Sequence, residues 1–184
     1  MYANDTIYIK VHFLYGSRPT KEFKNIEKDW FGGKLGGHVG IEFSPNKIVD
    51  FVPVRNSTKT KSGKFAIHSI STFYNIFGTS EDSVKKVIFE IPITIEQKFK
   101  LDSIINEYTT SSPYDYSFLG MRCASATYDL LAQVSLLKIL SFNKVILKVF
   151  YPKRLRRILF LQGEIKGWRI SKQEGTKRRK WDNH

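Results

Sequence analysis

Apolar and polar residues alternate over several short stretches of the chain, and this period of two is typical of β-strands. β-Branched and aromatic residues are frequent in the same stretches, and turn-forming residues separate them. The pattern predicts strands over residues 6–16, 38–43, 47–53, 64–70, 84–93 and 167–173. Only Ser44-Pro45-Asn46 joins the second strand to the third, so we expect an antiparallel hairpin there. Pro92 indicates that the end of strand 84–93 lies at a sheet edge.

Three later segments have helical patterns. Thr94 and Gln97 have the spacing of a capping box, which predicts a helix from there to about Tyr108. A second helix is predicted to begin near Cys123 and to run through residue 140, apolar on most faces like a buried central helix. A third, basic and amphipathic, begins at Pro152, because proline is well tolerated in a first helical turn.

Most of the predicted strands are contiguous in the sequence, and the predicted helices follow them. This order predicts an α+β fold, with an antiparallel β-sheet packed against helices. The chain has 184 residues, of which 41% are hydrophobic and 14% aromatic. This length and composition are sufficient for one domain with a hydrophobic core, and the chain is too short to expect two domains. We therefore expect a single domain over residues 1–170 and a basic C-terminal tail over residues 171–184.

The single cysteine, Cys123, excludes an intramolecular disulfide framework and a multi-cysteine zinc site. No cofactor and no metal are expected. The first residues lack the basic start and apolar run of a secretory signal, so the chain as given is expected to be cytoplasmic. No apolar run reaches the ~18–20 residues of a transmembrane helix, so an integral membrane protein is not expected.

The positive charge of the chain is concentrated near its C-terminus. The net charge is +13, and residues 144–184 contain 13 Lys and Arg but three acidic residues, a net charge of +10. Such a region is either a solvated basic face or a contact for an anionic surface. No specific nucleic-acid binding is expected, because none of the usual motifs is present. For residues 150–161 we favour a helix packed on the sheet with its arginines in solvent over one lying on anionic lipid.

Cys123 is predicted to stand at the N-terminus of its helix. The helix dipole and the free N–H groups of a first turn stabilise a thiolate and lower its pKa from the ~8.5 of a free thiol. The same N–H groups can bind a developing oxyanion. Arg122 would add positive potential if its side chain turned inward. The competing interpretation is that Cys123 is a small buried hydrophobic residue.

Of the four histidines, His38 is the strongest candidate for a catalytic base. Gly36 and Gly37 precede it and are expected to clear space for a substrate beside the ring. His12 and His68 lie within strand patterns, where half-exposed strand residues are expected. His184 is the last residue and is expected to be disordered.

The predicted hairpin brings a carboxylate to His38. With a three-residue loop, Phe43 pairs with Lys47 and Gly40 with Asp50, so His38 and Asp50 point to one face as diagonal neighbours about 7–8 Å apart. Asp50 can then accept one imidazole N–H and leave the other nitrogen for a thiol. Gly40 is expected to leave the space between them open. Glu42 shares this face and competes for the role, but we favour Asp50.

The segment "GGHVGIEFSPNKIVDFVP" (residues 36–53) resembles the His-containing hairpin of the circularly permuted NlpC-type papain-like proteins, the group that includes lecithin:retinol acyltransferase. "RCASATYDLL" (residues 122–131) is similar to the helix that carries their nucleophile, and histidine before cysteine is the permuted order. The resemblance covers about residues 32–135. It implies a permuted papain-like fold with Cys123 as nucleophile, His38 as general base and Asp50 orienting it. Two departures are Arg122, where relatives often have asparagine, and Asp50, where they frequently have histidine.

The resemblance implies a thiol-dependent hydrolase or acyltransferase that acts on a small-molecule, peptide or lipid substrate. Peptide-type amides are the first expectation and lipid esters the second. The alternative is a non-catalytic binding module on the same scaffold, whose basic C-terminal region binds an acidic partner such as anionic lipid or nucleic acid.

Overall fold

The computed structural model describes residues 6–27, 37–54, 62–77, 80–116 and 120–182. Its strands are β1 (Ile7–Leu14), β2 (Ser17–Pro19), β3 (His38–Ser44), β4 (Lys47–Pro53), β5 (Gly63–His68), β6 (Lys86–Ile93), β7 (Arg169–Gln173) and β8 (Arg179–Trp181). Its helices are α1 (Ile70–Phe77), α2 (Ile95–Thr110), α3 (Cys123–Gln133), α4 (Phe142–Lys148) and α5 (Pro152–Lys166), with a short 3₁₀ helix at Lys21–Phe23.

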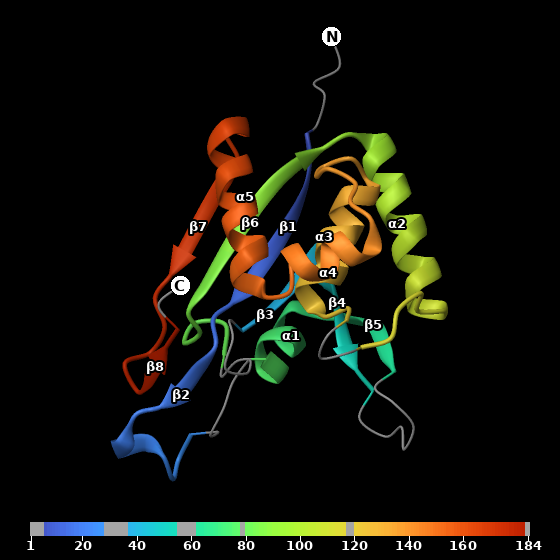
Figure 1. Cartoon of the computed structure of the whole chain (residues 1–184). Helices are drawn as coiled ribbons and strands as arrows, with labels where there is room; N and C mark the ends of the chain where they lie inside the picture. The colour runs from blue at the N-terminus through green and yellow to red at the C-terminus, as the bar shows by residue number, and fades with distance from the viewer. Residues whose placement is uncertain (1–5, 28–36, 55–61, 78–79, 117–119, 183–184) are drawn as a thin grey trace.

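Six strands form one antiparallel sheet in the order β5-β4-β3-β1-β6-β7, and β2 pairs with β8 in a separate two-stranded sheet. Figure 1 shows α2, α3, α4 and α5 gathered on one side of the six-stranded sheet. The predicted α+β class with an antiparallel sheet is confirmed. Pro92 lies beyond Glu90, the last residue of β6 that pairs with β7. On the β7 side, therefore, no described strand needs a backbone N–H from position 92, which proline lacks.

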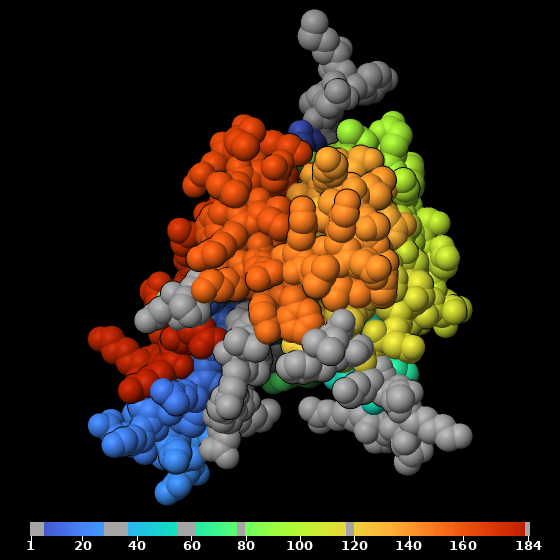
Figure 2. Space-filling view, in the orientation of Figure 1, coloured from blue at the N-terminus to red at the C-terminus, as the bar shows by residue number. Residues whose placement is uncertain are grey.

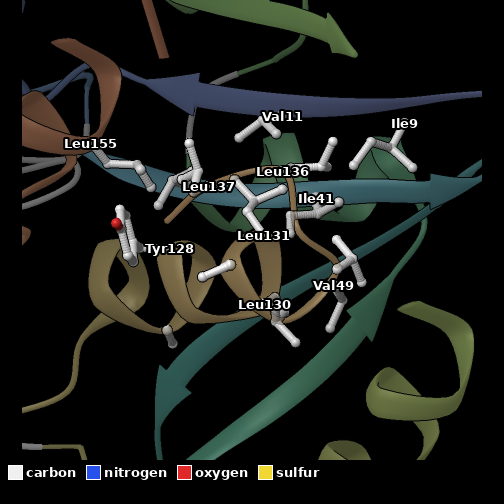
Figure 3. Packing of buried hydrophobic residues seen from close by; sticks show 14 of the residues in the cluster. Ile9, Val11, Ile41, Val49, Tyr128, Leu130, Leu131, Leu136, Leu137 and Leu155 are labelled. Carbon is white, nitrogen blue, oxygen red and sulfur yellow. The ribbon is translucent and has the colours of Figure 1, made fainter. Parts of the chain in front are cut away.

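The main core lies between the sheet and helices α2, α3 and α5. Alternate residues of β1 and β3 point into it, including Val11 and Ile41, which are fully buried. Figure 3 shows Leu131 of α3 and Leu136 from the segment after it packed toward these two side chains. Since α3 buries almost all of its surface here, the sheet fixes the position of its first residue.

The opposite face of the sheet is covered by α1, a helix that the sequence patterns did not predict. Phe73 and Tyr74 of α1 pack with Leu14 and Ile48 in a second, smaller core. The Ser69 hydroxyl accepts a hydrogen bond from the Thr72 N–H at 3.1 Å, as in a helix N-cap. Because both faces are covered, even polar residues of β3 and β4 are buried.

The boundaries of the longer helices follow local chemistry. The capping box predicted for α2 is confirmed, with Gln97 N–H donating to Thr94 Oγ1 at 3.2 Å and Thr94 N–H to Gln97 Oε1 at 3.0 Å. The expectation that the Cys123 helix continues to residue 140 is wrong, because α3 ends at Gln133. Ser135 has a φ of 61°, and the Leu136 N–H donates back to the Leu131 carbonyl at 3.0 Å, which is the hydrogen bonding of a Schellman ending.

The hairpin between β3 and β4 has the predicted register but a different turn. Ser44 pairs with Lys47, so the turn holds two residues, Pro45 and Asn46, and Asn46 takes a φ of 58°. A bulge between Glu42 and Ser44 absorbs the extra residue. The pairing of Gly40 with Asp50 is therefore confirmed, although the three-residue loop used to predict it is wrong.

The expected C-terminal tail is part of the fold through residue 182. β7 extends the six-stranded sheet, and β8 pairs with β2. Arg179 is buried, donates from Nε to Ser17 Oγ at 2.8 Å and lies 2.9 Å from Glu27 through Nη1. A tail boundary at residue 170 is wrong, because it would divide β7. His184 lies outside the described residues.

α5 is packed as expected, except for one arginine. Arg154 and Arg157 are exposed, whereas Arg156 is 2% exposed with its guanidinium 3.9 Å from the centre of the Tyr15 ring. Burial lowers the pKa of Arg156. The expectation of solvent-facing arginines is thus wrong for Arg156, whose planar head stacks on an aromatic ring. None of the described helices is long and apolar enough to cross a membrane.

Candidate active site

His38 is the first residue of β3, and its ring is held by Asp50 of the next strand. His38 Nε2–H donates to Asp50 Oδ2 at 2.7 Å, and both residues are buried, with 7% and 2% exposure. Burial alone would raise the pKa of Asp50, but the hydrogen bonds and charges of His38 and His68 lower it overall. Asp50 is thus an ionised acceptor, which fixes the ring and leaves Nδ1 free of this contact.

Cys123 lies within hydrogen-bonding reach of the same ring. Burial disfavours the charged form of His38 and lowers its pKa. The negative charge of Cys123 and the hydrogen bonds to Asp50 and Cys123 outweigh burial and raise the pKa of His38 to about 10. Since Nε2 binds Asp50, Nδ1 is the ring nitrogen left for the hydrogen bond with Cys123. The structure therefore brings together all three residues selected from the sequence.

The sulfur stands at the start of α3, as predicted. Arg122 is the N-cap with extended backbone, and the first intrahelical bond runs from the Ala126 N–H to the Arg122 carbonyl at 2.9 Å. The Arg122 N–H donates to Ser125 Oγ at 2.7 Å, a second hydrogen bond across the first turn of the helix. The N–H groups of Cys123 and Ala124 thus precede the helical ladder, in the position where they can bind an oxyanion.

Glu42, the competing carboxylate, is bound to a different histidine. His12 Nε2–H donates to Glu42 Oε2 at 2.9 Å, and the Tyr74 hydroxyl donates to His12 Nδ1 at 2.7 Å. Burial lowers the pKa of His12, so this ring is neutral and accepts from Tyr74. His12 is 2% exposed rather than half-exposed as expected. This Tyr74–His12–Glu42 network stabilises the α1 side of the sheet and leaves Asp50 as the carboxylate for His38.

His68 is a site residue that sequence reasoning missed. Its Nε2 lies 3.3 Å from Asp50 Oδ1, the oxygen that does not bind His38. β5 places it there, because Ala66 pairs with Asp50 and His68 lies two residues along on the same face. The sequence did not predict that His68 lies near Asp50, because residues 55–61 separate the two strand patterns and do not fix the register of β5 against β4.

Tyr116 is a second addition to the site. Burial and then the negative charge of Cys123 raise the pKa of Tyr116 to about 12, with a smaller contribution from Asp50. Its ring stacks on Phe51, with centroids 5.6 Å apart. In the sequence, Tyr116 stands in a polar stretch after the helix predicted to end near Tyr108, and no pattern there identifies it as a site residue. Tyr116 therefore lies close enough to Cys123 and Asp50 for their charges to act on its hydroxyl.

The glycines near His38 have packing roles instead of the expected role of opening a substrate channel. Gly37 has a φ of +84°, and a Cβ on it would lie 1.6 Å from the Leu14 carbonyl oxygen. A Cβ on Gly40 would lie 3.0 Å from the Phe73 ring, which itself packs against His38 with centroids 5.7 Å apart. The space at Gly40 is therefore filled by Phe73. Gly36 lies outside the described residues.

The Arg122 side chain extends toward α5 and packs on an aromatic ring. Its guanidinium lies 4.6 Å from the centre of Phe150, which follows α4. Arg122 still acts on the site electrostatically, because its charge opposes the rise in the pKa of Tyr116.

Within the described ranges, no group of three or more His, Cys, Asp and Glu side chains is arranged to hold a metal ion. The chain matches no protein-family model, no curated protein and no solved structure.

Proposed function

We propose that the protein is a thiol-dependent hydrolase or acyltransferase that acts on an amide or ester bond through Cys123, His38 and Asp50. One observation carries the proposal: a buried imidazole is held between an ionised carboxylate and the lone thiol, and its pKa is raised to about 10 by these partners. Such a ring is protonated at neutral pH, and an imidazolium beside a cysteine favours the reactive thiolate.

The reaction begins when the thiolate attacks the substrate carbonyl carbon. A carbon–sulfur bond forms, and the carbonyl electrons move to the oxygen, which the first-turn N–H groups of α3 bind. His38 Nδ1–H then gives its proton to the leaving amine or alcohol as the carbon–nitrogen or carbon–oxygen bond breaks. Water or another acceptor loses a proton to His38, attacks the acyl-enzyme and releases Cys123.

The fold adds support to this assignment. A cysteine-opened helix packed on an antiparallel sheet, with the histidine and carboxylate on adjacent strands, is the arrangement implied by the resemblance to circularly permuted NlpC-type papain-like proteins. We propose that fold for the chain. Peptide-type amides are the first substrate class to test and lipid esters the second.

The test is labelling with a thiol-reactive acyl probe, followed by assays on amide and ester panels. We expect the native chain to be labelled at Cys123, the His38→Ala variant to be labelled about 10²-fold more slowly, and Cys123→Ala not at all. If the native chain and His38→Ala react at the same rate, and Cys123→Ala turns over every substrate that the native chain does, the enzyme proposal is wrong. The non-catalytic binding module would then be the better description.

A further inference from the structure

The surface formed by α4, α5 and the segment joining α3 to α4 combines exposed apolar side chains with uncompensated positive charge. We define it as the α4–α5 face. Figure 2 shows these segments, in orange, as one continuous surface over the middle of the molecule. Its large apolar side chains are 53–77% exposed: Ile139, Phe142, Leu147, Leu161 and Ile165.

The charges of the α4–α5 face have one sign. Its exposed cations between residues 138 and 166 are Lys138, Lys144, Lys148, Arg154, Arg157 and Lys166. Glu164 is the exposed acidic residue in the same interval, which the structure describes throughout. None of the six cations forms a salt bridge with a described carboxylate. No described carboxylate therefore neutralises the positive charge of this face.

The apolar and cationic residues of this face come from separate elements and lie close together in two places. Arg154 Nη1–H donates to the Leu147 carbonyl at 2.7 Å, which joins the end of α4 to the start of α5. At the other end, Lys138 and Lys166 line one hollow of about 440 Å³, together with Leu136, Leu137 and Ile158 among others. Ile139 and Ile165 are the sequence neighbours of these lysines, and Leu161 lies one turn before Ile165 on α5.

We propose that the α4–α5 face binds the surface of an anionic lipid bilayer. Protruding aliphatic side chains flanked by lysine and arginine satisfy both parts of such a surface, because the apolar groups enter the acyl boundary while the cations meet phosphate. Nucleic acid explains the charge but gives no reason to expose Leu161 and Ile165, since its binding surfaces rely on aromatic stacking and phosphate contacts. A second copy of the chain would set the same positive charges against each other.

The face lies next to the candidate active site. Arg122, the residue before Cys123, packs on Phe150, and Phe150 connects α4 to α5. A bilayer on this face would therefore lie close to Arg122, the residue before the thiol. Binding itself needs no catalysis, so this inference stands or fails separately from the proposed function.

Vesicle sedimentation tests the proposal with the full chain. We expect binding to phosphatidylcholine vesicles that contain about one third phosphatidylglycerol, and little binding to phosphatidylcholine alone. The Leu161→Ser/Ile165→Ser variant should reduce the partition coefficient at least tenfold, from the lost apolar burial. Arg154→Gln and Arg157→Gln should each reduce it by about fivefold. Phe99→Ser, an exposed apolar residue on α2, is the matched control and should bind like the native chain.

The outcomes separate the alternatives. Cys123→Ala should bind vesicles as the native chain does. A native chain that binds vesicles but turns over no amide or ester would contradict the proposed function and leave the bilayer proposal standing. If the native chain does not prefer anionic vesicles, or if the Leu161→Ser/Ile165→Ser variant with a native circular dichroism spectrum binds them unchanged, the bilayer proposal is wrong. Tighter binding to DNA or heparin that is indifferent to the apolar change would identify a purely electrostatic surface instead.

Discussion

His38 and Asp50 are bonded across two strands without being paired in the ladder: Nε2 lies 2.7 Å from Oδ2, while the residue opposite Asp50 is Gly40. The bond is diagonal, so it depends on the register of the β3–β4 hairpin. A shift of one residue would turn Asp50 to the other face of the sheet.

This bond predicts unequal effects for the two nearby carboxylates. Asp50→Asn removes the charge that holds the imidazolium, so acyl-probe labelling of Cys123 should slow by about 10²-fold. Glu42→Gln should leave the labelling rate within about twofold, because Glu42 binds His12. It should nevertheless lower Tm, since a buried partner is lost. Equal slowing in both variants would contradict the assignment of Asp50.

The raised pKa of His38 predicts a loss of stability at high pH. A histidine with a folded pKa of about 10 contributes stability that is fully present below its unfolded pKa of ~6.5 and is lost as the pH rises through 10. We expect Tm to fall more steeply between pH 8 and about pH 10 in the native chain than in His38→Asn, as measured by circular dichroism. Parallel curves for the two proteins would show that His38 is not protonated in the fold.

The same ion pair predicts how the thiol reacts. An ordinary thiol loses reactivity about tenfold per pH unit below ~8.5, whereas a thiolate held by an imidazolium keeps it. Iodoacetamide should therefore alkylate Cys123 about tenfold faster in the native chain than in His38→Asn at neutral pH. Equal rates in the two proteins would contradict the ion pair.

Tyr116 is expected to assist acyl chemistry without activating the thiol. Its hydroxyl can donate to the oxyanion, so Tyr116→Phe should slow acyl-probe labelling by about tenfold and leave iodoacetamide alkylation unchanged. Tyr128→Phe is the control on α3, because the Tyr128 hydroxyl donates to the Lys138 carbonyl, away from the site. A fall in both reactions of Tyr116→Phe would assign it a positioning role through Cys123 instead.

Gly37 and Gly167 provide a test of the backbone next to His38. Both have positive φ, but a Cβ on Gly37 meets the Leu14 carbonyl, whereas nothing lies within 4 Å of one on Gly167. Gly167→Ala should cost about 1–2 kcal/mol of unfolding free energy from conformation alone. Gly37→Ala should cost clearly more in urea unfolding and should also slow labelling, because His38 must shift. Equal costs would mean that the chain at Gly37 relaxes freely.

Local patterns in the sequence were sufficient for the elements whose signals are themselves local. The period of two marked the six strands of the main sheet (β1, β3, β4, β5, β6 and β7), and a capping box marked the start of α2. The hairpin pattern indicated that Asp50 lies beside His38, although the structure reaches that register with a two-residue turn and a bulge between Glu42 and Ser44. These features depend on neighbours within a few positions, so the chain alone specifies them.

Tertiary packing decided the rest. α1 is a short helix whose Phe73 and Tyr74 gain their stability from the second core, and β8 needs β2, more than 150 residues earlier, for its pairing. The connection before β5 does not fix the register of that strand, so the sequence did not place His68 near Asp50. The choice between Glu42 and Asp50 depended on the position of His12 in β1, because His12 binds Glu42.

The sequence by itself determined that Cys123 opens a helix. It also indicated that His38 and Asp50 share a face, a relationship that depends on the bulge between Glu42 and Ser44, which offsets the two-residue turn. Only the tertiary structure decided that these two elements meet, because α3 reaches β3 through buried contacts such as Leu131 against Ile41. It also decided that Phe73 fills the space beside Gly40. Burial by distant segments, which no local pattern encodes, raises the pKa of Tyr116. At His38 burial acts in the opposite direction, and the contacts with Cys123 and Asp50, which only the tertiary structure brings together, raise its pKa.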